Sequence, residues 1–157
     1  MTDESPVIEL QNLTKVYQNG VEFRALDNAN LRIKKGEFVA IVGPSGSGKS
    51  TLMHLIGLLD TPSSGTLLID GKDVTKMSDK ERSIMRNRIL GFVFQYHHLL
   101  PDFTALENVM MPLLIAGKST EKAKNVAEKL LKEVGLEERM DHRPGELSGG
   151  EQQMLAM

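Results

Sequence analysis

The sequence predicts an α/β fold, in which a mixed part with strands and helices precedes a helical part. Three observations predict it: two β-type stretches within the first 33 residues, a compact apolar stretch that runs into a glycine-rich loop and a helix-periodic segment, and two amphipathic stretches after residue 100. A chain of 157 residues fits one domain with a real core. We therefore expect a single domain, residues 1–157, whose β layer and loop core (1–95) meet the helical part (96–157) near Gln95.

The N-terminal elements are predicted from pattern and turn residues. Residues 7–17 and 24–33 flank the turn-like "QNGVE" and predict an antiparallel N-terminal layer. The apolar "EFVAIV", residues 37–42, predicts a strand, and residues 49–59 repeat apolar side chains at helical spacing. The chain thus reads strand, loop, helix at this point.

The remaining elements follow from caps and periodicity. Turn residues surround a short strand within residues 61–74, and residues 78–89 predict a helix with Ser78 as its N-cap. Further along the chain we expect a strand at 90–94 and helices at 104–116 and 119–135, the second starting at a Ser/Thr cap and ending near Gly135.

Composition excludes several classes of protein. Lys and Arg number 19 against 21 Asp and Glu, so no basic field exists to neutralise nucleic-acid phosphates, and we expect no nucleic-acid partner. The absence of cysteine excludes disulfides and cysteine metal sites. The acidic N-terminus lacks the pattern of a secretory signal, and apolar stretches such as "VMMPLLIA" fall short of the ~20 residues that span a bilayer. We expect a soluble chain in the cytosol.

The segment "GPSGSGKS" fits the phosphate-binding pattern G-x-x-x-x-G-K-[ST] between a predicted strand and a predicted helix. Glycines let successive backbone N–H groups converge on an anion, and the following helix adds its positive end. Lys49 can reach the β- and γ-phosphates, and the Ser50 hydroxyl can bind Mg²⁺. The alternative is an ordinary glycine-rich turn, which the flanking elements disfavour. The predicted nucleotide-binding positions are Gly43, Pro44, Ser45, Gly46, Ser47, Gly48, Lys49, Ser50 and Thr51.

The segment "LSGGEQQ" opens a second candidate site. Ser148 and Glu151 have the spacing of a capping box, so taken alone the segment is a well-capped helix start. The paired glycines Gly149 and Gly150, however, leave backbone N–H groups uncovered at a helix N-terminus, where an anion can approach.

A phosphate loop followed at a distance by LSGGEQQ resembles the ATP-binding cassette (ABC) proteins, over nearly the whole chain. The resemblance implies a P-loop NTPase core of the ABC type with a helical subdomain, and ATP and Mg²⁺ as cofactors. It also implies a head-to-tail homodimer, in which Ser148, Gly149 and Gly150 of one copy contact the γ-phosphate held by the other.

Two further positions match elements of that family. Tyr17 resembles the aromatic residue that stacks on adenine, and Gln95 resembles the glutamine that touches Mg²⁺ and the attacking water, a catalytic role. Without the resemblance, an aromatic residue in a strand is as readily a core residue, and a glutamine at a strand end is unremarkable.

The stretch "FQYHHLLPDFTALENVMMPLLI" is similar to the ATP-binding subunits of lipoprotein-releasing transporters. This implies a peripheral protein on the cytoplasmic face of the inner membrane, with integral membrane subunits docking near Tyr96 to Leu114. His97 and His98 are expected neither to bind metal nor to catalyse, since no spacing supplies further ligands. Macrolide-exporter and cell-division ATPases, non-transport ABC ATPases, and unrelated P-loop kinases or GTPases are the alternatives.

The chain departs from the family pattern near its end. Met154 stands where the family has Arg, and the family's later Asp-Glu strand and switch histidine are not in the sequence, because all four histidines precede residue 147. We therefore expect a fold incomplete at its C-terminus, a fragment of a longer chain. It should bind ATP weakly at best, hydrolyse almost none, and associate through an open sheet edge.

Overall fold

The computed structural model describes residues 5–157. They divide into two compact units, 5–86 and 87–157. This division falls earlier in the chain than the junction that the sequence predicts near Gln95. Within the described residues, no helix is both long and apolar enough to cross a membrane.

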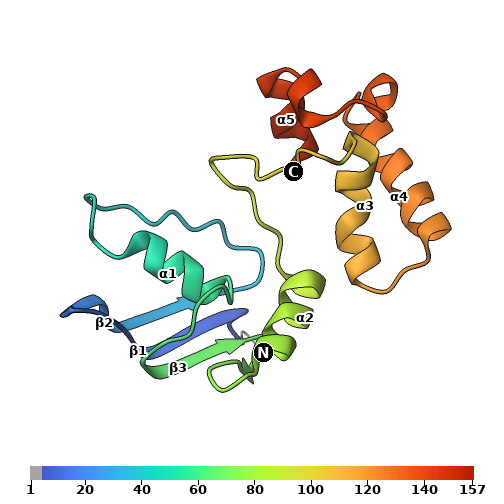
Figure 1. The fold of residues 1–157 in the computed structure, drawn as a ribbon. Coiled ribbons are helices and arrows are strands. Elements are labelled where there is room, and N and C mark those ends of the chain that lie inside the picture. The colour runs from blue at the N-terminus through green and yellow to red at the C-terminus, as the bar shows by residue number, and fades with distance from the viewer. Residues whose placement is uncertain (1–4) are drawn as a thin grey trace. The chain divides into compact units, whose positions relative to one another are not determined.

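The first unit is built on a four-stranded antiparallel sheet of order β2-β1-β3-β4 (Figure 1). The predicted N-terminal layer is confirmed, because the first two strands pair in antiparallel register and Gly20 turns the chain between them with φ +80°. The strands are β1 (Ile8–Asn19), β2 (Val21–Ile33), β3 (Ser64–Ile69) and β4 (Lys72–Asp73).

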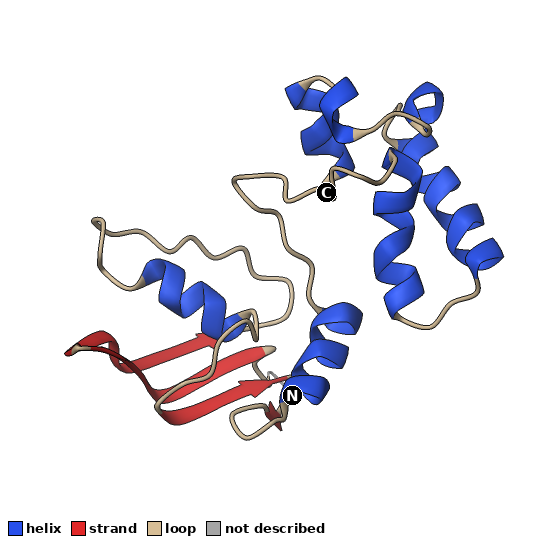
Figure 2. Cartoon of the chain, viewed as in Figure 1, coloured by secondary structure: helices blue, strands red, loops and turns tan. Residues whose placement is uncertain are grey.

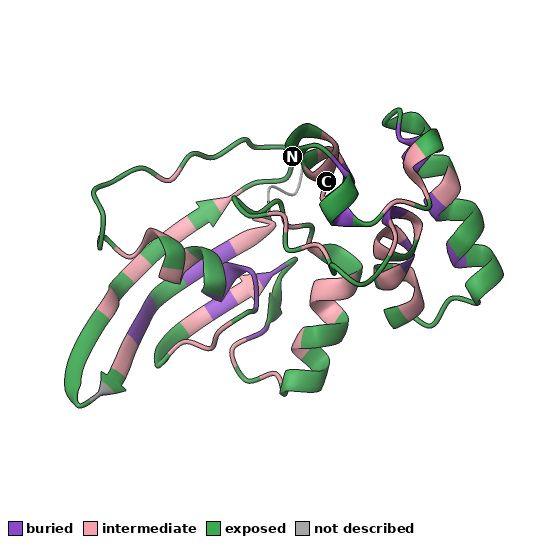
Figure 3. Ribbon diagram, turned by 45° about the horizontal axis from the view of Figure 1, so that its top comes forward, coloured by how far each residue is buried: buried purple, intermediate pink, exposed green. Residues whose placement is uncertain are grey.

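Helix α1 (Lys49–Ile56) lies against one face of this sheet (Figure 1). In this unit, the buried positions concentrate in the central strands β1 and β3, where purple bands mark them in Figure 3, and at the end of α1. The buried apolar residues of the unit are Leu10, Leu13, Leu55, Ile56, Leu58, Leu67, Ile69 and Val74. This core holds α1 to the strands through the last turn of the helix, where Leu55 and Ile56 are buried.

The predicted N-cap of α2 (Asp79–Ile89) is confirmed. The Glu81 backbone N–H donates to Ser78 Oγ at 3.4 Å, and the Ser78 backbone N–H donates to Glu81 Oε2 at 2.9 Å. The two orphan N–H groups are thus satisfied reciprocally at the helix start.

The two strands predicted at residues 37–42 and 90–94 are wrong: both segments are irregular (Figure 2). Phe38 is 98% exposed, Val42 86% and Val39 43%, so most of the apolar run is uncovered. A strand that is apolar on both faces is stable only when neighbours pair its edges and helices cover it. Within the described residues, no strand pairs with either segment.

The second unit is helical, as predicted. Its main helices are α3 (Ala105–Ile115), α4 (Thr120–Glu133) and α5 (Gly149–Leu155), with 3₁₀ turns at Glu137–Arg139 and Pro144–Glu146. The side chains of Thr104, Ser119 and Ser148 each accept a backbone N–H from the first turn of the helix that follows. A buried cluster of Ala105, Leu131, Leu136, Leu147 and Leu155 joins the three helices. Met110, Ala123 and Ala127 form a second cluster between α3 and α4.

Candidate functional site

The glycine-rich loop ends at the open N-terminus of α1. Gly48 is the N-cap, no side chain caps the helix, and the first turn carries no acidic residue. Gly46 and Gly48 have φ of +79° and +86°, conformations that glycine adopts at little cost. Uncapped N–H groups and the positive helix end make this a place for an anion.

Gly48 also sits where no other residue fits. A Cβ built on Gly48 would lie 2.4 Å from the backbone O of Ala25 in β2. The same construction at Gly46 meets nothing within 4 Å. The loop is therefore in direct contact with β2 at Gly48 and open at Gly46.

The side chain of Lys49 is hydrogen-bonded to the loop that precedes it. Its Nζ donates to the backbone O of Gly43 at 2.8 Å and of Pro44 at 2.6 Å, and lies 3.4 Å from Ser47 Oγ. The Lys49 ammonium therefore lies beside the first residues of the glycine-rich loop. A phosphate oxygen would be a stronger partner than these neutral carbonyls, because both groups would then carry charge.

Six of the predicted phosphate-loop positions line one cavity of about 200 Å³, together with two residues of β2. Gly43, Pro44 and Ser47 belong to the same loop but do not line the cavity. The lining residues are Phe23, Ala25, Ser45, Gly46, Gly48, Lys49, Ser50 and Thr51. The structure therefore gathers the loop into one concave surface, while the role of each residue stays a prediction.

Tyr17, the predicted adenine-stacking residue, does not line this cavity. Its hydroxyl donates to Asp60 Oδ2 at 2.9 Å, and Lys15 Nζ lies 4.9 Å from the ring centroid. Burial, followed by the hydrogen bond to Asp60, raises the pKa of the Tyr17 phenol. The Thr51 side chain is a further hydrogen-bonding partner of the phenol, and the sequence alone predicts none of these contacts.

Lys15 and Asp60 form a half-buried ion pair beside Tyr17. Lys15 Nζ lies 2.6 Å from Asp60 Oδ1 and donates to the Thr61 backbone O at 2.7 Å. Burial acts to raise the pKa of the Asp60 carboxyl, but the hydrogen bonds from Lys15, Thr61 and Tyr17 outweigh it and hold that pKa below its ordinary value. Asp60 thus stays ionised and fixes the phenol. A residue 43 positions away gives no local sequence signal for this contact.

In the second unit, the capping box predicted at Ser148 is confirmed. The Glu151 backbone N–H donates to Ser148 Oγ at 3.3 Å, and the Ser148 backbone N–H donates to Glu151 Oε2 at 2.7 Å. Gly149 and Gly150 are exposed, and a Cβ on either would meet nothing within 4 Å. Gln95 is exposed in the loop before α3. The catalytic and Mg²⁺-binding roles of Gln95 stay predictions.

Two further contacts fix the LSGG segment. Arg139 Nε donates to Glu151 Oε1 at 3.0 Å. The side-chain amide of Gln152 donates to the backbone O of Pro144 at 2.8 Å and of Leu147 at 3.1 Å. These bonds join the start of α5 to the preceding 3₁₀ turns.

The carboxyl of Glu151 should titrate far below the ordinary glutamate range. The Ser148 N–H and hydroxyl, followed by Arg139, lower the pKa of Glu151 to about 2. Because the pKa is lower in the folded state, the stabilisation is complete above the unfolded pKa near 4.5 and is lost as the pH falls toward 2. An NMR titration of the side-chain carbon should show this midpoint. Arg139→Gln should raise it and Arg143→Gln should not; a midpoint near 4.5 in the parent chain would contradict the capping geometry.

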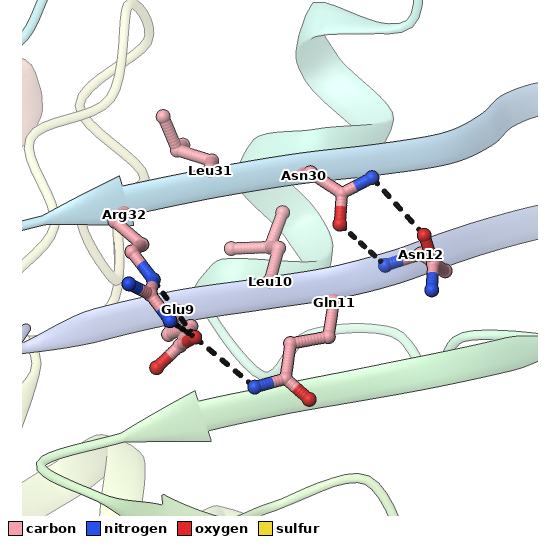
Figure 4. Close-up of a pocket in the computed structure, with 7 residues that line it drawn as sticks. All are labelled: Glu9, Leu10, Gln11, Asn12, Asn30, Leu31 and Arg32. Atoms are coloured by element: carbon pink, nitrogen blue, oxygen red, sulfur yellow. Dashed lines mark hydrogen bonds and ion pairs between the residues drawn. The ribbon is translucent and has the colours of Figure 1, made fainter.

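Two other hollows contain fewer groups that are placed to bind a ligand. One is a shallow hollow on the outer sheet face, where Asn12 pairs with Asn30, and Glu9 with Arg32 and Gln11 (Figure 4). Its polar groups already satisfy one another, and it contains no residue of the glycine-rich loop.

The other hollow lies in the second unit and has a volume of about 890 Å³. Apolar side chains such as Phe92, Phe94 and Leu113 dominate its lining. His97 and His98 also line it, and the His98 ring packs edge-on against Phe94 with centroids 4.9 Å apart. Among the described residues, no group of three His, Cys, Asp or Glu side chains is placed to hold a metal ion.

Comparison with known proteins explains the pairing of the two glycine motifs. Residues 26–157, which include both, match the model of the family described as "ABC transporter". The chain belongs to this ABC transporter family. Its α/β fold, with an antiparallel layer, a phosphate loop and a helical part, is therefore that of an ABC ATPase core.

The relatives within the ABC family are close. The chain is 49% identical over 156 residues to the lipoprotein-releasing system ATP-binding protein LolD of Bordetella pertussis, and covers 68% of that protein. It is 53% identical over 154 residues to LolD of Geobacter metallireducens, again covering 68%. These matches take in 99% and 98% of the present chain.

A solved structure gives the same result for the fold. The dimeric post-hydrolysis state of the ATP-binding cassette MJ0796, bound to ADP and Pi, matches with a TM-score of 0.84 and 44% identity. The match covers 95% of this chain and 66% of the MJ0796 chain. The present sequence thus spans about two thirds of the length of its relatives.

Proposed function

We propose that this chain is the ATP-binding subunit of a transporter that couples ATP binding and hydrolysis to the release of lipoproteins from the inner membrane toward the outer membrane. The observation that carries the proposal is the similarity to LolD, at 49 to 53% identity over nearly the whole chain. Both glycine motifs lie within the matched region, and both are exposed for ligands.

The phosphate loop fits ATP with Mg²⁺. The open helix end and the Lys49 ammonium suit the phosphates, and the exposed Ser50 hydroxyl suits the metal ion. Ser50 is the residue that would hold Mg²⁺, and the bound ion would neutralise negative charge on the triphosphate. The residues of this chain hold and orient the triphosphate, because Lys49 supplies a positive charge and the loop N–H groups supply donors. Gln95 is proposed to orient the attacking water.

We infer that two copies work together as a homodimer. Ser148, Gly149 and Gly150 are exposed, so they are available to the nucleotide of a partner copy. A relative at 44% identity is described as dimeric and bound to ADP and Pi, which supports this arrangement. In it, the LSGG segment of each copy would contact the γ-phosphate held by the other. The dimer would lie at the cytoplasmic face of the inner membrane.

We propose that integral membrane subunits dock on residues 96–114, from Tyr96 to Leu114. In this segment Tyr96 is 72% exposed, Leu100 39% and Phe103 38%. Leu99 is less suited to contact a partner, since it packs against the buried cluster of the second unit. Large exposed side chains of this kind are typical anchors at protein interfaces.

This surface supplies the experiment that tests the proposed function. In the protein extended to the full length of its relatives and coexpressed with the membrane subunits of a lipoprotein-releasing transporter, Leu100→Asp and Phe103→Asp should abolish co-purification and lipoprotein release. ATP binding should be unchanged, because neither residue belongs to the phosphate loop. Val126→Asp, an exposed apolar position on α4 outside the segment, is the matched control.

Two results would reject the proposal. If both Leu100→Asp and Phe103→Asp still co-purify with the membrane subunits, residues 96–114 are not the docking surface. Capture of macrolide-exporter or cell-division membrane subunits in preference to lipoprotein-releasing ones would favour those related functions instead.

A further inference from the structure

We propose that Phe23 is a base-contacting residue of the nucleotide site and helps to set its specificity, in addition to the predicted Tyr17. This inference rests on the proposed function of the phosphate loop as a nucleoside triphosphate site. Phe23 is the one aromatic residue in the lining of the cavity formed with Ser45, Gly46 and the start of α1, among the residues that the structure describes.

The strand register places Phe23 next to Tyr17. The two residues are direct cross-strand partners of β1 and β2, so their side chains lie on the same face of the sheet. Ala25, two positions along β2, lines the same cavity as Phe23, and its backbone O lies against Gly48 of the loop. Phe23 therefore lies immediately beside the point at which the phosphate loop contacts the sheet.

The ring of Tyr17 is less available than that of Phe23 for contact with a nucleotide base. The Asp60 carboxylate holds its hydroxyl at 2.9 Å, and the Lys15 ammonium lies 4.9 Å from its ring centroid. A cation at this distance is attracted to a ring face, which leaves at most the other face for a ligand. Phe23 has no hydroxyl to be held and is 57% exposed at the edge of the cavity.

The side chains that β2 contributes to the cavity indicate how a nucleotide base would bind there. The side chains of Phe23 and Ala25 have no hydrogen-bonding atoms. The Phe23 ring can stack on a planar heterocycle, but neither side chain can distinguish the hydrogen-bonding groups at the edge of that heterocycle. A base bound here is held by contact area and ring stacking. We therefore expect Phe23 to favour nucleotides over inorganic polyphosphate, with little discrimination between ATP and GTP.

The test compares ATP with inorganic tripolyphosphate in calorimetric titrations of the protein extended to the full length of its relatives. Phe23→Ala should weaken ATP binding about three- to tenfold, the effect of losing one ring stack, and leave tripolyphosphate binding unchanged. Phe23→Trp should keep or improve the ATP affinity. Val21→Ala is the matched control, because Val21 is an 80% exposed apolar residue of the same strand outside the cavity.

The outcomes separate this inference from the proposed function. If Phe23→Ala binds ATP as tightly as Val21→Ala does, or weakens both ligands equally, Phe23 does not contact the base. If the parent chain binds neither ATP nor tripolyphosphate, the phosphate loop itself is not a nucleotide site, and the proposed function fails along with the inference.

Discussion

Replacement of Lys49 by methionine is expected to weaken ATP binding roughly ten- to hundredfold. Lys49 is the only cationic residue in the described lining of the phosphate-loop cavity. A charge-assisted hydrogen bond contributes about 1.5 to 3 kcal/mol, and each 1.4 kcal/mol is tenfold in affinity. Methionine keeps most of the length and apolar volume of the lysine stem, so the change removes the charge more than the packing.

The measurement is a calorimetric titration with Mg²⁺ and ATP, in parallel with Lys35→Met. Lys35 is an exposed lysine of the same unit that lies outside the cavity lining, so its variant should bind as the parent does. Because Lys49 also bonds to the carbonyls of Gly43 and Pro44, its loss can loosen the loop as well. Equal affinities for Lys49→Met and the parent would remove the assignment of this loop to phosphate binding.

Local signals in the sequence were sufficient for the helices and for three of their N-caps. Ser78, Ser119 and Ser148 were all predicted from the residues beside them, since a cap depends on contacts within one turn. The glycine-rich loop was predictable for the same reason, because the spacing of its glycines, lysine and serine is itself local.

Long-range contacts were not predictable in this way. The apolar run from Phe38 to Val42 has the composition of a buried strand, yet composition cannot supply the neighbouring strands that such a strand needs. The site shows the same limit. Phe23 and Asp60 join the surroundings of Tyr17 through strand register and a contact across 43 positions, and neither has a motif.

Gly48→Ala should destabilise the first unit much more than Gly46→Ala. Both glycines have φ near +80°, where an alanine costs about 1 to 2 kcal/mol. At Gly46 the added methyl group enters open space, so this is the whole expected loss. At Gly48 it would lie 2.4 Å from the Ala25 carbonyl oxygen, a backbone atom that cannot rotate away.

Relief of that collision requires α1 to move away from β2, which opens the contact between the glycine-rich loop and the sheet. Overpacking of this kind costs about 1 to 3 kcal/mol in addition to the backbone cost. Urea unfolding of the two variants without nucleotide measures the difference directly. Amide exchange in α1 should quicken in Gly48→Ala and stay near the parent rate in Gly46→Ala. Equal losses of unfolding free energy in the two variants would show that Gly48 does not contact the Ala25 carbonyl in solution. The contact between β2 and the phosphate loop, on which the position of Phe23 beside that loop depends, would then be absent.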